Sequence, residues 1–419
     1  MIVKIRQRLD RRLDPVRANF WCHVARNGFS GAGYGVITGT DFLAVLVTVL
    51  GFEPAVLGIL AMVPGLAQLA QLFSAHRVET VRRKKRLLLY LDLCKWLPLL
   101  LVCASLALFG HESPVTALVV IAAVSFFGSI AITLMMAPEF DLIAETVPKN
   151  LISQIFGFSH AASAGMGLVL AAVVGVLLAQ IAFPLNYASV YLISILLLAL
   201  SWFALHLVDE MPHDGVPKSR QSFLEYFRDL LRVLKNDERY RAYILYESVR
   251  KVGVYAGVFY AMVAVKHHGM DPALAVGIFM AARQIAFMSG NVGFPLLAEK
   301  IGLKKVLAIG VVLFALAAFA ASVAPSANWF IPIIFIDALA GATTVATGTA
   351  FALRIYPSHR RVGYTTLTSL VFTPYAILLP LSFGFAVQTF GYVHVCWVSA
   401  FLLILSLLFL RRCTEKEDG

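Results

Sequence analysis

Long apolar stretches recur along almost the whole chain, and each is long enough to cross a membrane. A helix needs about 20 mainly apolar residues to span the hydrocarbon core of a bilayer. Only 14% of the 419 residues are charged, against about 25% in soluble domains, so lipid must cover most of the surface. The approximate spans are 27–49, 55–75, 87–109, 115–138, 155–181, 187–207, 246–266, 272–297, 303–324, 328–353, 363–388 and 392–410. The sequence therefore predicts an all-α membrane protein with twelve transmembrane helices.

The basic residues predict how these helices are oriented. Lysine and arginine are enriched in cytoplasmic loops of membrane proteins. With the N-terminus inside, thirty of the thirty-five lie on cytoplasmic flanks, and Lys266 is the one that falls in an outside loop. We expect both termini to be cytoplasmic, in a multi-pass protein of the cell membrane, with a bacterial inner membrane as the favoured location. Because the net charge of +11 comes from short clusters between apolar runs, it does not indicate nucleic-acid binding. We expect a monomer whose partners are membrane lipid and a small solute.

A polar segment divides the twelve spans into two sets of six. The predicted organisation is a six-helix bundle at 1–207, a cytoplasmic linker at 208–245 and a second six-helix bundle at 246–419. Within the linker, Ser222 and Glu225 have the spacing of a capping box, and the following apolar residues share one helical face. This pattern predicts an amphipathic helix on the inner membrane surface, either as a plain linker or with a regulatory role.

Corresponding loops in the two halves indicate an internal repeat. Short basic loops follow the second and fourth spans of each half, as expected of two bundles related by a pseudo-two-fold axis. The loop after the eighth span contains Glu299, Lys300 and Gly302, followed by Lys304 and Lys305. With Gly293 before it, this loop is similar to the G-x-x-x-D-R-x-G-R-R pattern of the major facilitator superfamily.

The resemblance to this superfamily covers essentially the whole chain and implies a secondary transporter built from two pseudo-symmetric six-helix bundles. It assigns gating roles to Glu299, Lys300 and Gly302, and to Arg77 in the first-half loop. That loop departs from the family pattern, with Ala75-His76-Arg77-Val-Glu79 in place of the acidic-basic-glycine core. The proline-containing motif of drug–proton antiporters is not matched in the fifth span, and no subfamily is identified.

Ionisable residues within spans are costly, by roughly 2.5–3.5 kcal/mol each on insertion scales, and are therefore candidates for function. Asp41 and Asp337 are predicted to couple transport to protons or sodium, because a buried carboxylate has a raised pKa and can exchange protons. The alternative is that each bonds to a neighbouring helix or lies near the outer interface. Arg283, next to Gln284, is predicted to bind an anionic substrate. The alternative for Arg283 is a permanent ion pair with Asp337 or another acid.

Two further sets of residues complete the prediction. Lys95 follows Asp92 by one helical turn, which predicts a local ion pair with the lysine reaching towards the cytoplasmic interface. Polar and aromatic side chains that could line a substrate pathway are Tyr34, Gln68, Gln71, Tyr255, Tyr260 and Tyr375. Pro374 and Pro380 in the eleventh span predict either a hinge or a plain kink.

Enzyme motifs are absent from the sequence, which has no Walker loop, no G-x-S-x-G and no HExxH. We expect no enzyme activity, no cofactor and no metal site, and the five scattered cysteines predict no disulfide. The predicted function is secondary active transport of a small organic solute, anionic or zwitterionic, by alternating access. The alternatives are a lipid or lysolipid flippase, and a transporter-like receptor or assembly factor that moves nothing.

Overall fold

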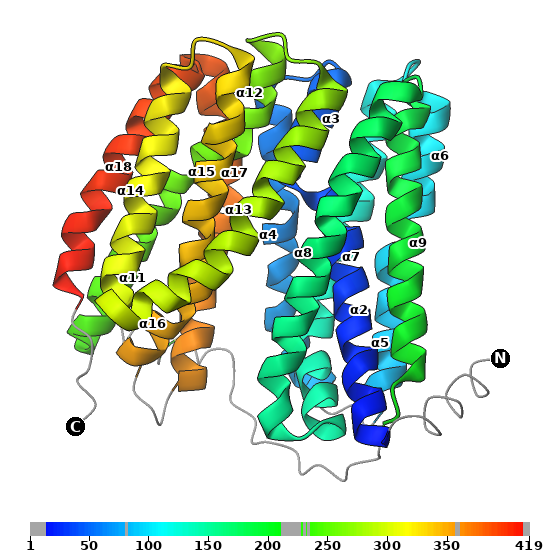
Figure 1. Cartoon of the computed structure of the whole chain (residues 1–419), viewed down its shortest axis with the longest axis vertical. Coiled ribbons are helices and arrows are strands. Elements are labelled where there is room, and N and C mark those ends of the chain that lie inside the picture. Colours follow the sequence, from blue (N-terminus) through cyan, green and yellow to red (C-terminus); the bar gives the residue numbers. More distant parts are fainter. Residues whose placement is uncertain are drawn as a thin grey trace. The chain divides into compact units, whose positions relative to one another are not determined.

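The computed structural model describes residues 14–79, 83–210, 228, 232, 235–356 and 361–413, and within them the chain is helical throughout. Figure 1 shows the long helices running alongside one another within each half of the chain. The linker segment that carries the predicted amphipathic helix lies almost wholly outside the described residues.

The described part of the first half contains eight helices, which correspond to the six predicted spans. They are α2 (Pro15–Thr38), α3 (Thr40–Val49), α4 (Pro54–Glu79), α5 (Lys84–Trp96), α6 (Leu99–Phe109), α7 (Pro114–Thr146), α8 (Lys149–Gln180) and α9 (Leu185–Leu207). The first span is divided into α2 and α3 at Gly39, and the third into α5 and α6 around Pro98. Asp41 follows the first of these divisions, in the first turn of α3.

The second half follows the same scheme. Its elements are α11 (Glu238–Val254), η1 (Tyr255–Phe259), α12 (Tyr260–Lys266), α13 (Pro272–Ile301), α14 (Leu303–Ser322), η2 (Ala327–Trp329), α15 (Phe330–Thr343), η3 (Thr344–Gly348), α16 (Thr349–Ile355), α17 (Arg361–Phe390) and α18 (Tyr392–Arg412). The tenth span is interrupted by the π-helical turn η3. Pro374 and Pro380 both lie inside the single helix α17.

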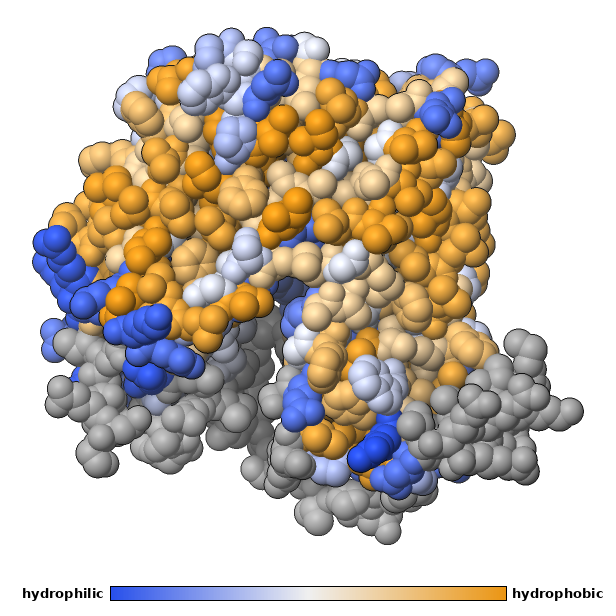
Figure 2. Space-filling model, in the orientation of Figure 1, coloured by the Kyte–Doolittle hydropathy of each residue, from blue (hydrophilic) through white to orange (hydrophobic). Residues whose placement is uncertain are grey.

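The helices have the length and surface of membrane spans. Among the described residues, ten helical segments are long and apolar enough to cross a membrane, and the two remaining predicted spans contain the shorter apolar segments Pro54–Ala70 and Ala327–Thr343. Hydrophobic residues cover the middle of the surface in Figure 2, whereas hydrophilic residues gather towards the ends of the helices. The prediction of an all-α membrane protein of six plus six spans is confirmed.

Contacts within the described helices divide the chain into two compact units. One contains residues 1–42 and 66–220, and the other contains residues 43–65 and 221–419. The second unit therefore includes most of α3 and the first half of α4, although these belong to the first half of the sequence. Each unit is described separately below.

The internal repeat is visible as the same helix crossing in each unit. A Cβ atom at Gly33 of α2 would lie 3.1 Å from the Ser194 carbonyl oxygen of α9, and one at Gly253 of α11 would lie 3.1 Å from the Ser399 carbonyl oxygen of α18. A second fully buried serine follows seven residues after each, at positions 201 and 406. Glycine and serine at such crossings let helix backbones approach closely. The first and last helices of each six-span set therefore pack in the same way.

The first half of α4 packs against α17 in the second unit through glycine. A Cβ atom at Gly65 would lie 2.5 Å from the Ala376 carbonyl oxygen, and a Cβ atom at Gly384 would lie 2.9 Å from the Pro54 carbonyl oxygen. Because these neighbours are backbone atoms of helices, they cannot move aside at little cost. The close approach of α4 and α17 depends on residues without side chains.

We predict that Gly65→Ala destabilises the protein by about 1–3 kcal/mol, the usual cost of forcing an extra methyl group into a packed site. Gly157→Ala in α8 is the matched control, since beyond the backbone of its own helix no atom lies within 4 Å of the added methyl group. The control is expected to gain up to about 1 kcal/mol from helix propensity. Thermal unfolding of both variants in detergent measures the difference, and equal Tm values would contradict the described packing.

Candidate functional site

The first unit contains a buried arginine that the sequence analysis missed. Arg26 of α2 is 3% exposed, and its Nη1 donates to the Glu139 carboxylate of α7 and to Asn27 Oδ1 at 3.1 Å. The Ser201 hydroxyl of α9 donates to the Arg26 carbonyl oxygen at 2.9 Å. A guanidinium keeps its charge at membrane depth, so it needs such a carboxylate. Arg26 thus ties α2 to α7.

A second ion pair lies in the same unit. Asp92 and Lys95 of α5 are one helical turn apart, with their charged groups 2.5 Å from each other. Their side chains are 0% and 4% exposed, and the Lys95 ammonium also donates to Ser30 Oγ of α2 at 3.0 Å. The predicted ion pair is present, but the predicted reach of Lys95 towards the interface is wrong. The ammonium turns inward because Asp92 and Ser30 compensate its charge there.

Tyr34 extends this polar face of α2 by one more turn. Its half-buried hydroxyl lies against the Ser129 side chain of α7, and a Cβ atom at Gly128 would lie 3.5 Å from that hydroxyl. Of the substrate-binding residues predicted in the first unit, Tyr34 lies on the same face of α2 as Arg26 and Ser30, because the three are spaced by four residues. Asp41, farther along the chain in α3, is buried with 3% exposure.

The second unit also holds a tightly bonded buried pair. Arg250 of α11 donates from Nε and Nη2 to the two carboxylate oxygens of Glu247, at 3.1 and 2.7 Å. Its Nη1 donates to Thr344 Oγ1 at 3.2 Å, which connects α11 to the π-helical turn η3. The next residue, Lys251, places its ammonium 4.9 Å from the centroid of the Phe372 ring. The signal in the sequence is the Glu-x-x-Arg spacing at the start of the seventh span.

Arg283 and Asp337 form the fourth of these buried ion pairs, between α13 and α15. Arg283 Nη1 lies 3.4 Å from Asp337 Oδ2, and the two side chains are 20% and 10% exposed. A Cβ atom at Gly257 would lie 2.8 Å from Asp337 Oδ1, so only glycine leaves room for this carboxylate. Tyr260 is buried beside the same two charges. The structure thus contains the ion pair that the sequence offered as the alternative role of Arg283.

Of the other residues predicted to bind substrate, those whose side chains the structure describes are half-buried or exposed. Gln68 is exposed and Gln284 is half-buried. The half-buried rings of Tyr255 and Tyr375 pack on Phe383 and Phe372, with centroids 5.9 and 5.4 Å apart. The side chains of Gln71 and Arg77 lie outside the described residues.

The predicted gating loop joins α13 to α14. Glu299 and Lys300 are exposed at the end of α13. Gly302 has φ +89°, a backbone conformation that favours glycine. The backbone explains the glycine at this position, while the gating roles stay predictions.

The comparisons with known proteins agree with this architecture. Residues 254–419 match the family model described as Major Facilitator Superfamily. None of the curated proteins matches the chain.

Solved structures of transporters have a similar fold over nearly the whole chain. A D-xylose-proton symporter is 15% identical, with a TM-score of 0.71 over 94% of this chain and 97% of the symporter. A POT family transporter in complex with a thioalcohol-conjugated peptide is 13% identical, with a TM-score of 0.71 over 94% and 96%. A bacterial homologue of the iron transporter ferroportin is 16% identical, with a TM-score of 0.69 over 94% and 98%. The predicted superfamily resemblance is confirmed in fold.

We predict that Lys95→Met alone destabilises the protein by about 3–5 kcal/mol, because it leaves the Asp92 carboxylate buried without its countercharge. The double variant Asp92→Leu/Lys95→Met is expected to recover most of that loss, since it removes both charges. Thermal unfolding of the single and double variants measures the coupling. Additive losses in the double variant would show that the two groups do not compensate each other.

Proposed function

We propose that the protein is a secondary active transporter that moves a small organic anion or zwitterion by alternating access, with the Arg283–Asp337 pair as its exchangeable charge. The superfamily match of residues 254–419 and the fold support the transporter class. The observation that carries the finer proposal is the contrast between the two arginine–carboxylate pairs of the second unit.

The Arg250–Glu247 pair is suited to a structural role. Both guanidinium–carboxylate contacts are short, a third donor is bonded to Thr344, and the two side chains are only 7% and 9% exposed. Bidentate pairs of this kind are the strong ones. A solute group would have to break three bonds to reach Arg250, so we assign this pair to holding α11 against η3.

The Arg283–Asp337 pair is suited to exchange. Its contact is 3.4 Å, longer than either contact of Arg250 with Glu247, and the Arg283 side chain is 20% exposed. A longer, partly exposed ion pair costs less to open than a short buried one. A carboxylate or phosphate of a solute can therefore replace the Asp337 carboxylate on the guanidinium.

Exchange at this pair provides a route to ion coupling. A proton bound to the Asp337 carboxylate makes it neutral and leaves Arg283 without that countercharge. An anionic solute group then restores charge balance on Arg283, so proton and anion bind together. The energetic reason is that an uncompensated charge inside the membrane is disfavoured. The half-buried Gln284 lies next to Arg283 in the chain, and Tyr260 is buried beside the pair; these two residues would orient the solute.

Alternating access requires one end of the helices to open while the other closes. In the second unit, the ammonium of Lys266, the last residue of α12, lies 2.6 Å from the carboxylate of Glu53, which precedes α4. The glycine contacts between α4 and α17 lie in the same unit. We propose that these contacts close the outer end and must separate during the transport cycle.

We predict that Asp337→Asn abolishes concentrative uptake and its pH dependence while exchange of bound solute continues. The amide mimics the protonated carboxylate but cannot release a proton. Uptake into proteoliposomes with an imposed pH gradient measures this, using organic carboxylates and amino acids that raise the Tm of the purified protein by binding. Glu247→Gln is the matched control and is expected to lower the Tm without shifting the pH profile of the remaining uptake.

Asp41→Asn tests the second predicted coupling residue in the same assay. If both Asp41→Asn and Asp337→Asn retain concentrative uptake with unchanged pH dependence, neither carboxylate carries the ion. If no solute moves and Arg283→Ala leaves the cellular role intact, the transporter proposal fails.

We also predict that joining residues 53 and 266 stops transport. Glu53→Cys/Lys266→Cys places two thiols at exposed positions whose native charged groups are in contact. A short thiol-reactive cross-linker should reduce uptake to background, and a cleavable version should restore it on reduction. Each single cysteine variant is the control. Full activity of the cross-linked protein would show that this contact need not open.

A further inference from the structure

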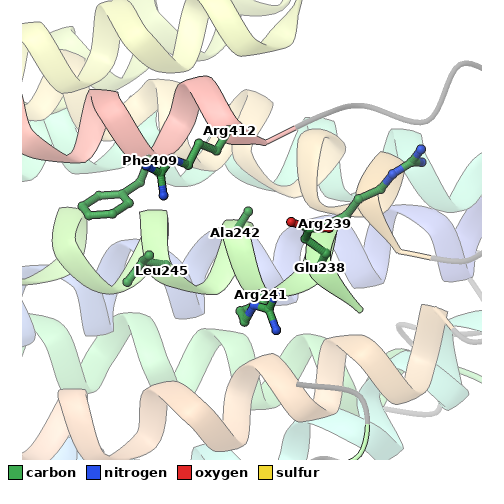
Figure 3. A pocket seen from close by; sticks show the side chains of 7 residues that line it. All are labelled: Glu238, Arg239, Arg241, Ala242, Leu245, Phe409 and Arg412. Atoms are coloured by element: carbon green, nitrogen blue, oxygen red, sulfur yellow. The ribbon is translucent and has the colours of Figure 1, made fainter. Parts of the chain in front are cut away.

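A basic cavity lies where the N-terminal end of α11 meets the C-terminal end of α18, within the second unit. Its volume is about 660 Å³. The lining residues are Glu238, Arg239, Arg241, Ala242, Leu245, Phe409 and Arg412. Figure 3 shows Arg412 and Phe409 of α18 beside Ala242 and Leu245 of α11, with Arg239 and Arg241 extending outward from α11 in different directions. The three arginines are exposed.

The charge of this cavity favours an anion. Three arginines and a single acidic residue, Glu238, line the cavity. The carbonyl oxygens at the end of α18 do not offset the positive charge, because Lys304 Nζ already donates to those of Arg411 and Cys413, at 2.9 and 2.7 Å. Guanidinium groups bind phosphate through paired N–H donors.

An apolar groove lies along the same face of α18. A lipid can place an acyl chain in such a groove and a soluble anion cannot, so the groove favours a lipid. The groove has a volume of about 260 Å³ and is lined by Val252, Ser382, Phe383, Ala386, Phe390, His394, Val395, Val398 and Leu402. Val398, Leu402, Phe409 and Arg412 are spaced by four, seven and three residues, which places them on one helical face. Groove and cavity therefore follow one another along α18.

The length of this face matches one leaflet of a membrane. The fourteen residue steps from Val398 to Arg412 rise about 21 Å, and half of a bilayer of about 40–45 Å, headgroup regions included, is also roughly 21 Å. An acyl chain can thus lie along the groove while its headgroup reaches the arginines. Large apolar side chains on α18 are exposed at this depth, such as Phe401 at 66% and Leu408 at 54%.

We propose that the cavity and groove bind one anionic phospholipid from the leaflet that faces the chain termini. Its phosphate lies among Arg239, Arg241 and Arg412, and an acyl chain packs along Leu402 and Val398. Basic pockets between helices on the cytoplasmic side are suited to anionic headgroups. The site is independent of the Arg283–Asp337 pair and of the transported solute.

The test uses the full chain purified in detergent and titrated with dioleoyl phosphatidylglycerol or dioleoyl phosphatidylcholine. Native mass spectrometry counts the lipids retained, and thermal unfolding follows the stabilisation. We expect the wild-type protein to retain phosphatidylglycerol selectively and to unfold at a higher temperature with it. The variant Arg239→Ser/Arg241→Ser/Arg412→Ser should bind this lipid about a hundredfold more weakly, at roughly 1 kcal/mol per basic residue.

The matched control is Arg83→Ser/Arg86→Ser/Lys305→Ser, which removes three exposed basic residues that do not line the cavity. It should retain wild-type selectivity, and an equal loss in the control would overturn the proposal because general charge would explain binding. Val398→Trp fills the groove and should also weaken phosphatidylglycerol binding. Unchanged binding would contradict the proposal that an acyl chain lies in the groove. If inorganic phosphate gives the same arginine-dependent stabilisation, the site binds a soluble anion and the lipid proposal is overturned.

Discussion

Compensation of charge at membrane depth is the constraint on which the arrangement of the helices depends. An ionised side chain in the hydrocarbon region needs an opposite charge or several hydrogen bonds. The structure meets this need by pairing Arg26 with Glu139, Lys95 with Asp92, Arg250 with Glu247, and Arg283 with Asp337. Two of these pairs join different helices, and the other two lie within one helical turn and bond to a neighbouring helix through a hydroxyl group. The charges therefore specify which helices must be neighbours.

Small residues allow these neighbouring helices to pack closely against one another. Lipid gives no hydrophobic driving force for helix association, so close van der Waals contact must supply much of it. Gly33 and Gly253 allow the first helix of each set to approach the last, and Gly257 leaves room for the Asp337 carboxylate. The last case connects packing to chemistry, because a methyl group at Gly257 would collide with the carboxylate proposed to exchange protons. At this point a position of close packing in η1 lies directly beside the proposed functional carboxylate of α15.

The sequence predicts the fold better than the site for a physical reason. Span length and the distribution of basic residues follow from the thickness and polarity of the membrane, and both can be counted along the chain. Which carboxylate meets which arginine depends on helix rotation, which apolar composition does not determine when both faces of a helix are apolar. Arg26 lies just before the predicted start of the first span, and Arg250 lies near the start of the seventh, so neither arginine is predicted at membrane depth. Lys95 is predicted to reach the interface because lysine side chains near the ends of spans usually do so. Its contact with Ser30, 65 positions away in the chain, becomes visible only in the structure.

The two units share a scaffold but supply charge to it differently. When α2 and α11 are aligned by their crossing glycines, Gly33 and Gly253, Ser30 of α2 corresponds to Arg250 of α11. Each of the two precedes its glycine by three residues. In the first unit the cation at this level comes from Lys95 on the neighbouring helix α5, which donates to Ser30. In the second unit Arg250 provides it from α11 itself. Both units therefore have a buried cation at this level, although it is carried by a different helix of the repeat in each. Arg283 and Asp337 lie outside this shared arrangement, as expected of the pair that we propose exchanges a proton or a solute.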